Sequence, residues 1–535
     1  MLAFPLSRRG FMAGSLAAGA ALHTKGAFAQ GTERRGGVLV VAADSEPRNL
    51  NPAIVASNGV FYVASKVIEP LAEMAYGGNG LVPRLATAWE GSPDGRSVRF
   101  TLREGVTWHD GKPFTSADVA FSALQVWKPL QNLGRVVFKD LEAVDTPDAR
   151  TAILRFANPT PFQLIRNALP ALTSVLPRHL YEGTDINANP ANTKLVGTGP
   201  FRFVEHRPGQ FYRLERNPSY WEANRPLLDG IVYQVLPDRG AIAAALEANQ
   251  IQLAAFSAVP LADLERLGKV PGVKVIPEGY EGITYQLTVE INHRRRELAD
   301  PRVRRAIAHA IDKRFVVDTI FLGYAKPSNG PIPAFDKQFH LAQTGAPDFD
   351  VRKANELLDQ AGFPRGANGT RFQLRLLPAP WFEQTRQFGD YLRQALRAVG
   401  IDAQIVNNDA AAHTRAVYTD HAFDLAVGSP VYRNDPAIST TILYQGGLPP
   451  GVPFSNQYGY SSPAMNDLIA EAAVAIDDAE RTRLYNDFQK LAGEDVPLVH
   501  VAEFTFITVA RDSVRNVANN PRWATSHWAD TCLAS

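Results

Sequence analysis

The sequence has little of what a disulfide-rich domain, a metal centre or a nucleic-acid-binding surface requires. Its 535 residues include a single cysteine, Cys532, which excludes an internal disulfide framework and a cysteine-rich metal site. The 11 histidines are scattered without ligand spacing, and the chain has no HExxH, CxxC or P-loop motif. The 55 basic and 54 acidic residues nearly cancel. We therefore expect no cofactor, no metal site and no nucleic-acid partner.

Long hydrophobic runs are also absent. No stretch approaches the ~18 to 20 apolar residues that a transmembrane helix needs. The N-terminus instead carries a twin-arginine pattern at residues 7–12 (SRRGFM), a short apolar stretch over 13–22 and an Ala-x-Ala cleavage sequence at 27–29. This predicts a Tat-type signal peptide over residues 1–29, with a Sec signal as the alternative. No cysteine lies near the cleavage site, so we expect no lipid anchor and a periplasmic location.

The mature chain that this cleavage would leave is large and nearly neutral. Its roughly 500 residues exceed what a single hydrophobic core usually holds, so two or more lobes are expected. Loss of the three cations Arg8, Arg9 and Lys25 lowers the formal net charge from +1 to −2. No internal repeat and no low-complexity linker divides the chain.

Signals for turns, strands and a helix start are more closely spaced in residues 85–121 (LATAWEGSPDGRSVRFTLREGVTWHDGKPFTSADVAF) than in any other segment. The turn sequence 92–95 (SPDG) lies between two alternating apolar runs, which predicts a β-hairpin. In the second run, alternate residues from 98 to 102 are apolar, so one face of that strand is expected to be buried. Thr115 and Asp118 have the spacing of a capping box, which predicts that a helix begins there.

This stretch resembles the signature of family 5 of bacterial extracellular solute-binding proteins, the group that contains the oligopeptide-, dipeptide- and nickel-binding proteins of ABC importers. Residues 197–203 (GTGPFRF), 217–221 (NPSYW) and 303–317 (VRRAIAHAIDKRFVV) resemble the same family. We interpret the glycines of the first segment as backbone turns, because Pro200 blocks the helix that a phosphate-binding loop requires. The resemblance extends over residues 36–517.

The resemblance implies an α/β fold of the two-lobed periplasmic binding protein type (Venus flytrap, class II or cluster C). The first lobe is expected over residues 30–283, with an extra subdomain at about 73–195. The second lobe is expected over 284–500, and residues 501–535 return to the first lobe as a strand and a tail. Two crossings between lobes would form a hinge. The role of the end of the tail and of Cys532 stays open.

Two segments of the second half give sharper expectations. A strand over 372–377, a helix over 385–399 and a strand over 401–406 form a β-α-β unit, which predicts two parallel strands with a covering helix. Residues 499–509 are apolar with few breaks, and we predict one long strand that returns to the first lobe.

The function that the resemblance implies is the periplasmic substrate-binding component of an ABC importer. Such a protein binds a peptide-like or other small polar solute between its lobes, as a monomer, and delivers it to a permease driven by an ATPase. It is not an enzyme. Non-peptide ligands such as an opine, a sugar or a metal chelate stay open. Alternatives of another class are a sensory ligand receptor and a periplasmic hydrolase, whose catalytic residues would have to come together from distant segments. His109 and Asp110 are neighbours that could pose as an acid and a base, but the resemblance implies a structural role for this dipeptide.

Residues 428–436 (GSPVYRNDP) bear on the ligand. Peptide-binding members of the family usually have Gly-Trp at the first two positions and an aspartate three residues after the tryptophan, which pairs with the peptide ammonium group. Ser429 and Tyr432 occupy these two positions here. An unpaired buried ammonium costs roughly 2 to 5 kcal/mol, so a standard peptide is disfavoured.

The candidate ligand-binding residues combine aromatic faces with a possible carboxylate partner. The guanidinium of Arg433 has the fork that a carboxylate matches, although an ion pair with Asp435 or exposure to solvent is the alternative. An acidic, sugar-like or capped ligand would suit such a site. The full candidate set is Asn58, Trp381, Tyr432, Arg433 and Asp435.

Overall fold

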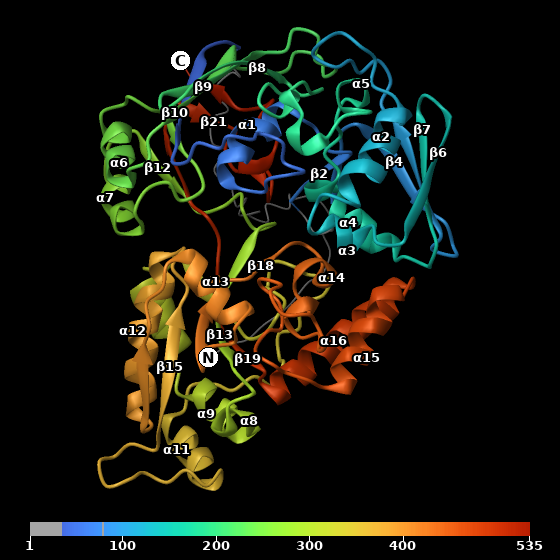
Figure 1. Cartoon of the computed structure of the whole chain (residues 1–535). Helices are drawn as coiled ribbons and strands as arrows, with labels where there is room; N and C mark the ends of the chain where they lie inside the picture. The colour runs from blue at the N-terminus through green and yellow to red at the C-terminus, as the bar shows by residue number, and fades with distance from the viewer. Residues whose placement is uncertain (1–34, 77–79, 535) are drawn as a thin grey trace, which may run out of the picture. The chain divides into compact units, whose positions relative to one another are not determined.

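The computed structural model describes residues 35–76 and 80–534, so the predicted signal peptide lies outside the described residues. The first large sheet has seven strands, and β1 in its middle runs parallel to both neighbours, β10 and β11. Its strands, in spatial order, are β12 (Val273–Ile276), β20 (Thr508–Arg511), β11 (Leu253–Ala254), β1 (Val38–Ala43), β10 (Gly230–Val235), β9 (Phe211–Arg216) and β8 (Phe201–Arg207). The main helices beside it are α1 (Asn58–Val67), α6 (Arg239–Glu247) and α7 (Leu264–Gly268) (Figure 1).

The hairpin predicted from residues 85–121 is confirmed. It belongs to a separate antiparallel sheet in the order β4 (Ala86–Gly91), β5 (Ser97–Leu102), β7 (Thr151–Phe156) and β6 (Leu141–Asp148). Val98, Phe100 and Leu102 of β5 are buried, and the residues between them are more exposed. The helix α2 (Ser116–Ser122) begins with the expected capping box of Thr115 and Asp118. Figure 1 shows α2, β4, β6 and β7 together, with α4 (Phe162–Leu172) nearby.

The second large sheet contains the predicted β-α-β unit. Strands β15 (Phe372–Pro378) and β16 (Ile401–Ile405) are parallel and are joined by α12 (Glu383–Ala398), as expected. The sheet order is β14 (Ala325–Pro327), β19 (Leu498–Phe504), β13 (Thr284–Ile291), β17 (Leu425–Gly428), β15 and β16, and β18 (Val431–Tyr432) pairs with β13. Its helices include α9 (Pro301–His309), α11 (Val351–Gln360), α13 (Ala410–Tyr418), α14 (Pro436–Ser439), α15 (Pro463–Val474) and α16 (Asp478–Asp495).

Both faces of this second sheet are buried. Leu425 and Val427 of β17 pack into one hydrophobic cluster, which also contains side chains of α9, α11 and α12. Ala426, which points to the opposite face, packs into another cluster with side chains of α15 and α16 and with Tyr432. A sheet buried on both faces tolerates continuous apolar strands, which explains why these strands read as apolar runs.

The chain passes between the two large sheets twice. It leaves the first sheet after β12 and enters the second at β13, and it returns between β19 and β20. The prediction of one long strand over 499–509 is therefore wrong. The chain leaves the second sheet at the end of β19, and residues 505–507 belong to no strand. It then joins the first sheet at β20, because one strand cannot follow both sheets. Aromatic rings pack at the crossing: the ring centroids of Tyr285 and Phe504 are 5.4 Å apart, and those of Tyr285 and Phe506 are 5.2 Å apart.

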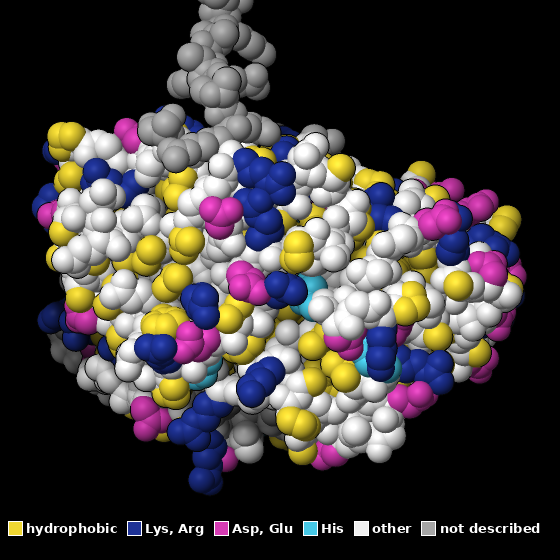
Figure 2. Space-filling model, turned by 90° about the horizontal axis from the view of Figure 1, so that it is seen from above, with side chains coloured by type: hydrophobic (Ala, Val, Ile, Leu, Met, Phe, Trp, Pro, Cys, Tyr) yellow, Lys and Arg dark blue, Asp and Glu magenta, His cyan; other side chains and the backbone are white. Residues whose placement is uncertain are grey.

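The described helices include no membrane span, and side chains of both charge signs lie on the face that Figure 2 shows. No helix in residues 35–76 and 80–534 is long and apolar enough to cross a bilayer. Figure 2 shows Lys and Arg side chains interspersed with Asp and Glu side chains on that face.

The glycines of residues 197–203 serve close packing, which corrects their interpretation as turns. A Cβ atom on Gly197 would lie 1.7 Å from the Val67 carbonyl oxygen at the end of α1, and one on Gly199 would lie 2.6 Å from the Lys66 oxygen. Neither glycine has a positive φ. The backbone N–H of Gly199 donates to the Val67 oxygen at 2.9 Å. Only a residue without a side chain allows the two backbones to approach this closely.

We expect Gly197→Ala to lower the free energy of unfolding by about 1–3 kcal/mol or more, since 1–3 kcal/mol is the usual cost of overpacking. The clash involves the backbone of a helix end, which cannot move aside as a flexible side chain could. Urea unfolding monitored by circular dichroism measures the loss. Gly268→Ala is the matched control, because the nearest atom to its Cβ lies at 3.7 Å. Equal stability of the two variants would contradict the packing argument.

Candidate ligand-binding site

A cavity of about 340 Å³ lies where the chain passes between the two sheets. Residues of both lobes line it, from α1 and residues 256–264 on one side and from β13, β19 and residues 381–384 on the other. Its aromatic walls include Phe256, Tyr285, Phe321, Trp381, Phe382 and Phe504. Its polar lining includes Asn58, Arg239, Ser257, Glu383, Gln384 and Thr505. A mostly apolar cavity with a few polar groups is typical of a site for a small organic ligand.

Two of the five candidate residues line this cavity. Asn58 is the first residue of α1, whose preceding residue Ser57 caps the helix by accepting from Val60 N. Trp381 lies on the opposite wall, just before α12. The structure therefore brings these two predicted residues together at one cavity, although they are far apart in the sequence.

Ser429 fixes the position of Trp381. The indole Nε1 of Trp381 donates to the Ser429 hydroxyl oxygen at 2.8 Å. The indole ring also meets the His413 ring edge to face at 5.1 Å and the Phe454 ring at 5.6 Å. Ser429, which stands where peptide-binding relatives usually have tryptophan, thus orients a tryptophan from another segment.

Tyr432 does not line the cavity. Its side chain is 1% exposed, and its hydroxyl donates to a carboxylate oxygen of Asp336. Burial, followed by the neighbouring Asp336 carboxylate, raises the pKa of Tyr432 well above its usual value. The residue belongs to the second-lobe core rather than to the cavity wall, because its hydroxyl already has a partner inside the lobe.

Asp435 is also engaged inside the protein, and its partner is not Arg433. Its carboxylate accepts from both terminal nitrogens of Arg481, at 2.7 and 2.8 Å, and neither side chain has any exposed area. It also caps α14 by accepting from Ala437 N at 3.0 Å. The alternative in which Arg433 pairs with Asp435 is therefore wrong.

Several cavity residues were missed in the sequence. Arg239 begins α6 and lies 4.0 Å from the Asp44 carboxylate, and Phe382 precedes α12. Phe504 and Phe506 also line the cavity. Their spacing of two residues in the sequence is the only feature that could have indicated them. Residues 35–76 and 80–534 contain no group of three or more His, Cys, Asp or Glu side chains that could hold a metal ion.

Two lobes joined by two crossings, with a cavity at the crossing, define a two-lobed solute-binding protein. The model for bacterial extracellular solute-binding proteins, family 5 Middle, matches residues 80–449. The chain belongs to this family. Its fold class is α/β, as predicted, and its relatives are substrate-binding proteins of ABC transporters.

Comparison with known proteins agrees with this assignment. The glutathione-binding protein GsiB of Pectobacterium atrosepticum is 27% identical over 434 residues, which cover 79% of this chain and 80% of that protein. The ABC transporter substrate-binding protein CtaP of Listeria monocytogenes has the same fold, with a TM-score of 0.83 at 22% identity over 94% of this chain and 100% of that one. The periplasmic protein DppA of Helicobacter pylori, solved with the peptide STSA, has a TM-score of 0.74 at 23% identity over 94% and 99% of the two chains.

Proposed function

We propose that this protein binds a small polar solute in the periplasm and delivers it to the permease of an ABC importer, which a cytoplasmic ATPase drives. The cavity of about 340 Å³ at the lobe crossing carries the proposal. A ligand that contacts both lobes stabilises the closed arrangement by its differential affinity, and the permease can distinguish that arrangement from the open one. The protein acts as a monomer and performs no chemistry itself.

The ligand that the cavity favours is peptide-like in size and only partly polar. The volume lies at the lower end of the range typical of ligand pockets, about 300–1,000 Å³. The 27% identical relative is named for glutathione, a tripeptide, which supports a ligand of that size. Asn58, Trp381 and Arg433 are the proposed ligand contacts. Tyr432 and Asp435 are not proposed as contacts, because Asp336 and Arg481 engage them inside the second lobe.

A thermal-shift screen of the chain from residue 30 tests this function. The panel contains glutathione, di- to pentapeptides, opines, sugars and nickel chelates. A ligand at 100 times its Kd adds about 2.7 kcal/mol to the unfolding free energy. Stabilisation by at least one solute is expected, and uptake of that solute is expected to stop when the gene is deleted. Turnover of the solute would favour a periplasmic hydrolase, and unchanged uptake would favour a sensory receptor.

Trp381→Ala is expected to weaken the binding of the solute identified in that screen by about 10-fold or more. The substitution removes an aromatic face from the cavity wall, and 1.4 kcal/mol of lost contact corresponds to a factor of ten. Calorimetric titration measures the change. Trp89→Ala, in β4 and outside the cavity, is the control and should bind normally. Normal binding by Trp381→Ala would show that Trp381 does not contact the ligand.

A further inference from the structure

Two arginines from different lobes lie at the lobe crossing without a carboxylate partner. Arg522, in the C-terminal tail, is only 5% exposed, and its Nη1 donates to the Gly282 carbonyl oxygen at 3.1 Å. Arg433 follows β18 in the second lobe. Within residues 35–76 and 80–534, neither guanidinium has an Asp or Glu oxygen within 4.0 Å. Arg433 is partly buried and Arg522 is buried. A buried arginine without an anionic partner is rare, because desolvation of the charge is costly.

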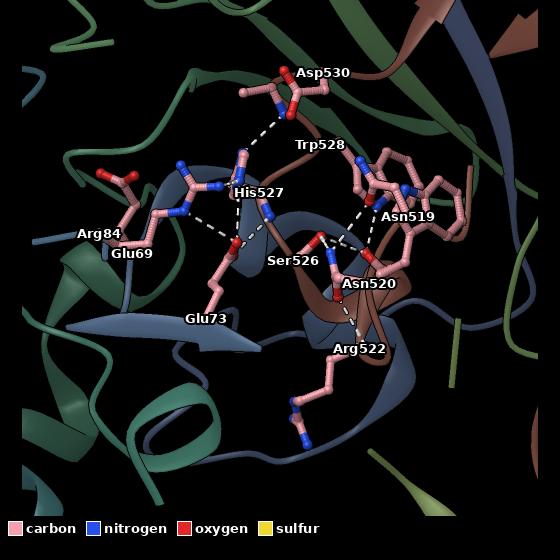
Figure 3. Close-up of polar contacts among 12 residues, drawn as sticks. Glu69, Glu73, Arg84, Asn519, Asn520, Arg522, Ser526, His527, Trp528 and Asp530 are labelled. Atoms are coloured by element: carbon pink, nitrogen blue, oxygen red, sulfur yellow. Dashed lines mark hydrogen bonds and ion pairs between the residues drawn. The ribbon is translucent and has the colours of Figure 1, made fainter. Parts of the chain in front are cut away.

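The acidic group whose charge acts on the pKa of Arg522, that of Glu73, is already occupied. Glu73 lies 3.2 Å from Arg84 Nε and 3.1 Å from His527 Nε2, and it also accepts from His527 N. Figure 3 shows the Arg522 side chain pointing away from this cluster. The cluster of Glu73, Arg84 and His527 is thus a closed structural network that leaves Arg522 unpaired.

The backbone brings Arg433 to the same place. Tyr432 pairs with Thr284 in the ladder between β18 and β13, so the next residue lies beside the chain at Gly282 and Ile283. Asn434 Nδ2 donates to Met74 Sδ at 3.1 Å. Met74 Sδ and Arg522 Cγ lie 3.0 and 2.6 Å from the position that a Cβ on Gly282 would occupy. Residues 433–434 and Arg522 therefore meet around Gly282.

The electrostatics agree with this geometry. Burial, followed by the charge of Arg433, lowers the pKa of Arg522 to about 9. Burial also lowers the pKa of Arg433, which is offset by the nearby hydroxyl of Tyr285, a residue of the cavity wall. Next to them, the side-chain oxygen Oδ1 of Asn434 is buried without a hydrogen-bond partner. The two guanidinium groups therefore lack an anion, and Asn434 Oδ1 lacks a hydrogen-bond donor.

We infer that Arg433 and Arg522 together bind a carboxylate of the ligand, so that the transported solute is an organic acid whose acidic end lies at the edge of the aromatic cavity. This rests on the proposed function and names its substrate class. Guanidinium groups match carboxylates with paired hydrogen bonds, and two of them from opposite lobes hold one anion between the lobes. Without ligand, the two like charges repel and disfavour closure. A bound carboxylate removes that repulsion and thus couples binding to closure.

Calorimetric titration with matched acid and amide pairs tests the inference on the chain from residue 30. The probes are glutathione and its diamide, Ala-Phe and its amide, and N-acetyl-Phe-Gly and its amide. In at least one pair the acid is expected to bind about 30-fold tighter than the amide, which corresponds to about 2 kcal/mol for a buried charge pair. Arg522→Gln and Arg433→Gln are expected to remove that preference. Arg515→Gln, an exposed change in the same tail, should retain it.

The outcomes separate this inference from the proposed function. Equal binding of acid and amide, or a preference that survives in Arg522→Gln, would overturn the carboxylate site and leave the solute-binding function intact. Failure of every solute to bind the unmodified protein would remove both.

Stability without ligand gives an independent measurement. Arg522→Gln removes a buried charge and Arg433→Gln a partly buried one, and neither charge has an anionic partner in the protein, so the Tm without ligand should be unchanged or higher. A lower Tm for both would assign the arginines a structural role and overturn the inference.

Discussion

Replacement of Asp435 by alanine is expected to lower the free energy of unfolding by about 3–5 kcal/mol, the usual cost of leaving a buried ion-pair partner uncompensated. The guanidinium of Arg481 donates twice to Asp435 and has no exposed area. Burial acts to lower the pKa of Arg481, but the Asp435 carboxylate together with the hydroxyls of Tyr485 and Tyr432 raises that pKa overall, so Arg481 stays charged in the core. The pair also contacts α4, because Arg481 Nη1 donates to Gln163 at 2.9 Å and Asn167 donates to Asp435 at 3.1 Å.

Two controls make the Asp435 experiment specific. Asp145→Ala breaks an ion pair in which both side chains are 50% exposed, and its cost should stay within about 1 kcal/mol. The double variant Asp435→Ala with Arg481→Met should recover most of the stability, because an apolar pair no longer leaves a buried charge. Urea unfolding measures all three. A double variant no more stable than Asp435→Ala would show that the loss of the α14 cap and of packing, rather than the unpaired charge, causes the effect.

Local rules explain the parts of the fold that could be predicted. The hairpin at 92–95 and the capping box of Thr115 and Asp118 depend on residues at most a few positions apart, so the sequence contains the whole interaction. The β-α-β unit over 372–406 follows in the same way from periodicity and length. The prediction of one long strand over 499–509 is wrong because the apolar run continues through the point where the chain changes sheets.

The candidate site could be predicted only in part, because its partners are distant in the sequence. Neighbouring side chains in residues 432–435 take different directions: Tyr432 bonds to Asp336, 96 positions away, and Asp435 bonds to Arg481, 46 positions away. Arg433 between them lies beside the chain at Ile283, at the lobe crossing. No local sequence pattern indicates which of these four side chains is directed toward a cavity. Arg522 illustrates the same limit, because only the return of the tail to Gly282 makes it a candidate.

The second large effect concerns Glu290 in β13, which makes the stability of the protein depend on pH. This side chain is 3% exposed, and burial raises its pKa to about 8, although a hydrogen bond from Tyr418 acts in the opposite direction. A Cβ on Gly428 of the neighbouring strand would lie 2.4 Å from Glu290 Oε1, so the carboxyl group is packed against the sheet. The protonated form is therefore favoured in the folded protein and the ionised form in the unfolded chain.

The sign of the pH effect follows from this difference. A raised pKa in the folded state gives a contribution to stability that is complete below the unfolded value of 4.5 and is lost as the pH rises to about 8. The loss is about 1.4 kcal/mol per pH unit in that window, or about 5 kcal/mol in all. Glu290→Gln keeps an acceptor for Tyr418 but cannot ionise, so it should unfold at higher urea than the unmodified protein near pH 8 and show no such advantage near pH 5. Glu142→Gln, at an exposed position of β6, should follow the unmodified protein at every pH. Parallel pH curves for Glu290→Gln and the unmodified protein would mean that water or a conformational change reaches this carboxyl group, because a buried carboxylate without a countercharge cannot avoid the cost of ionisation.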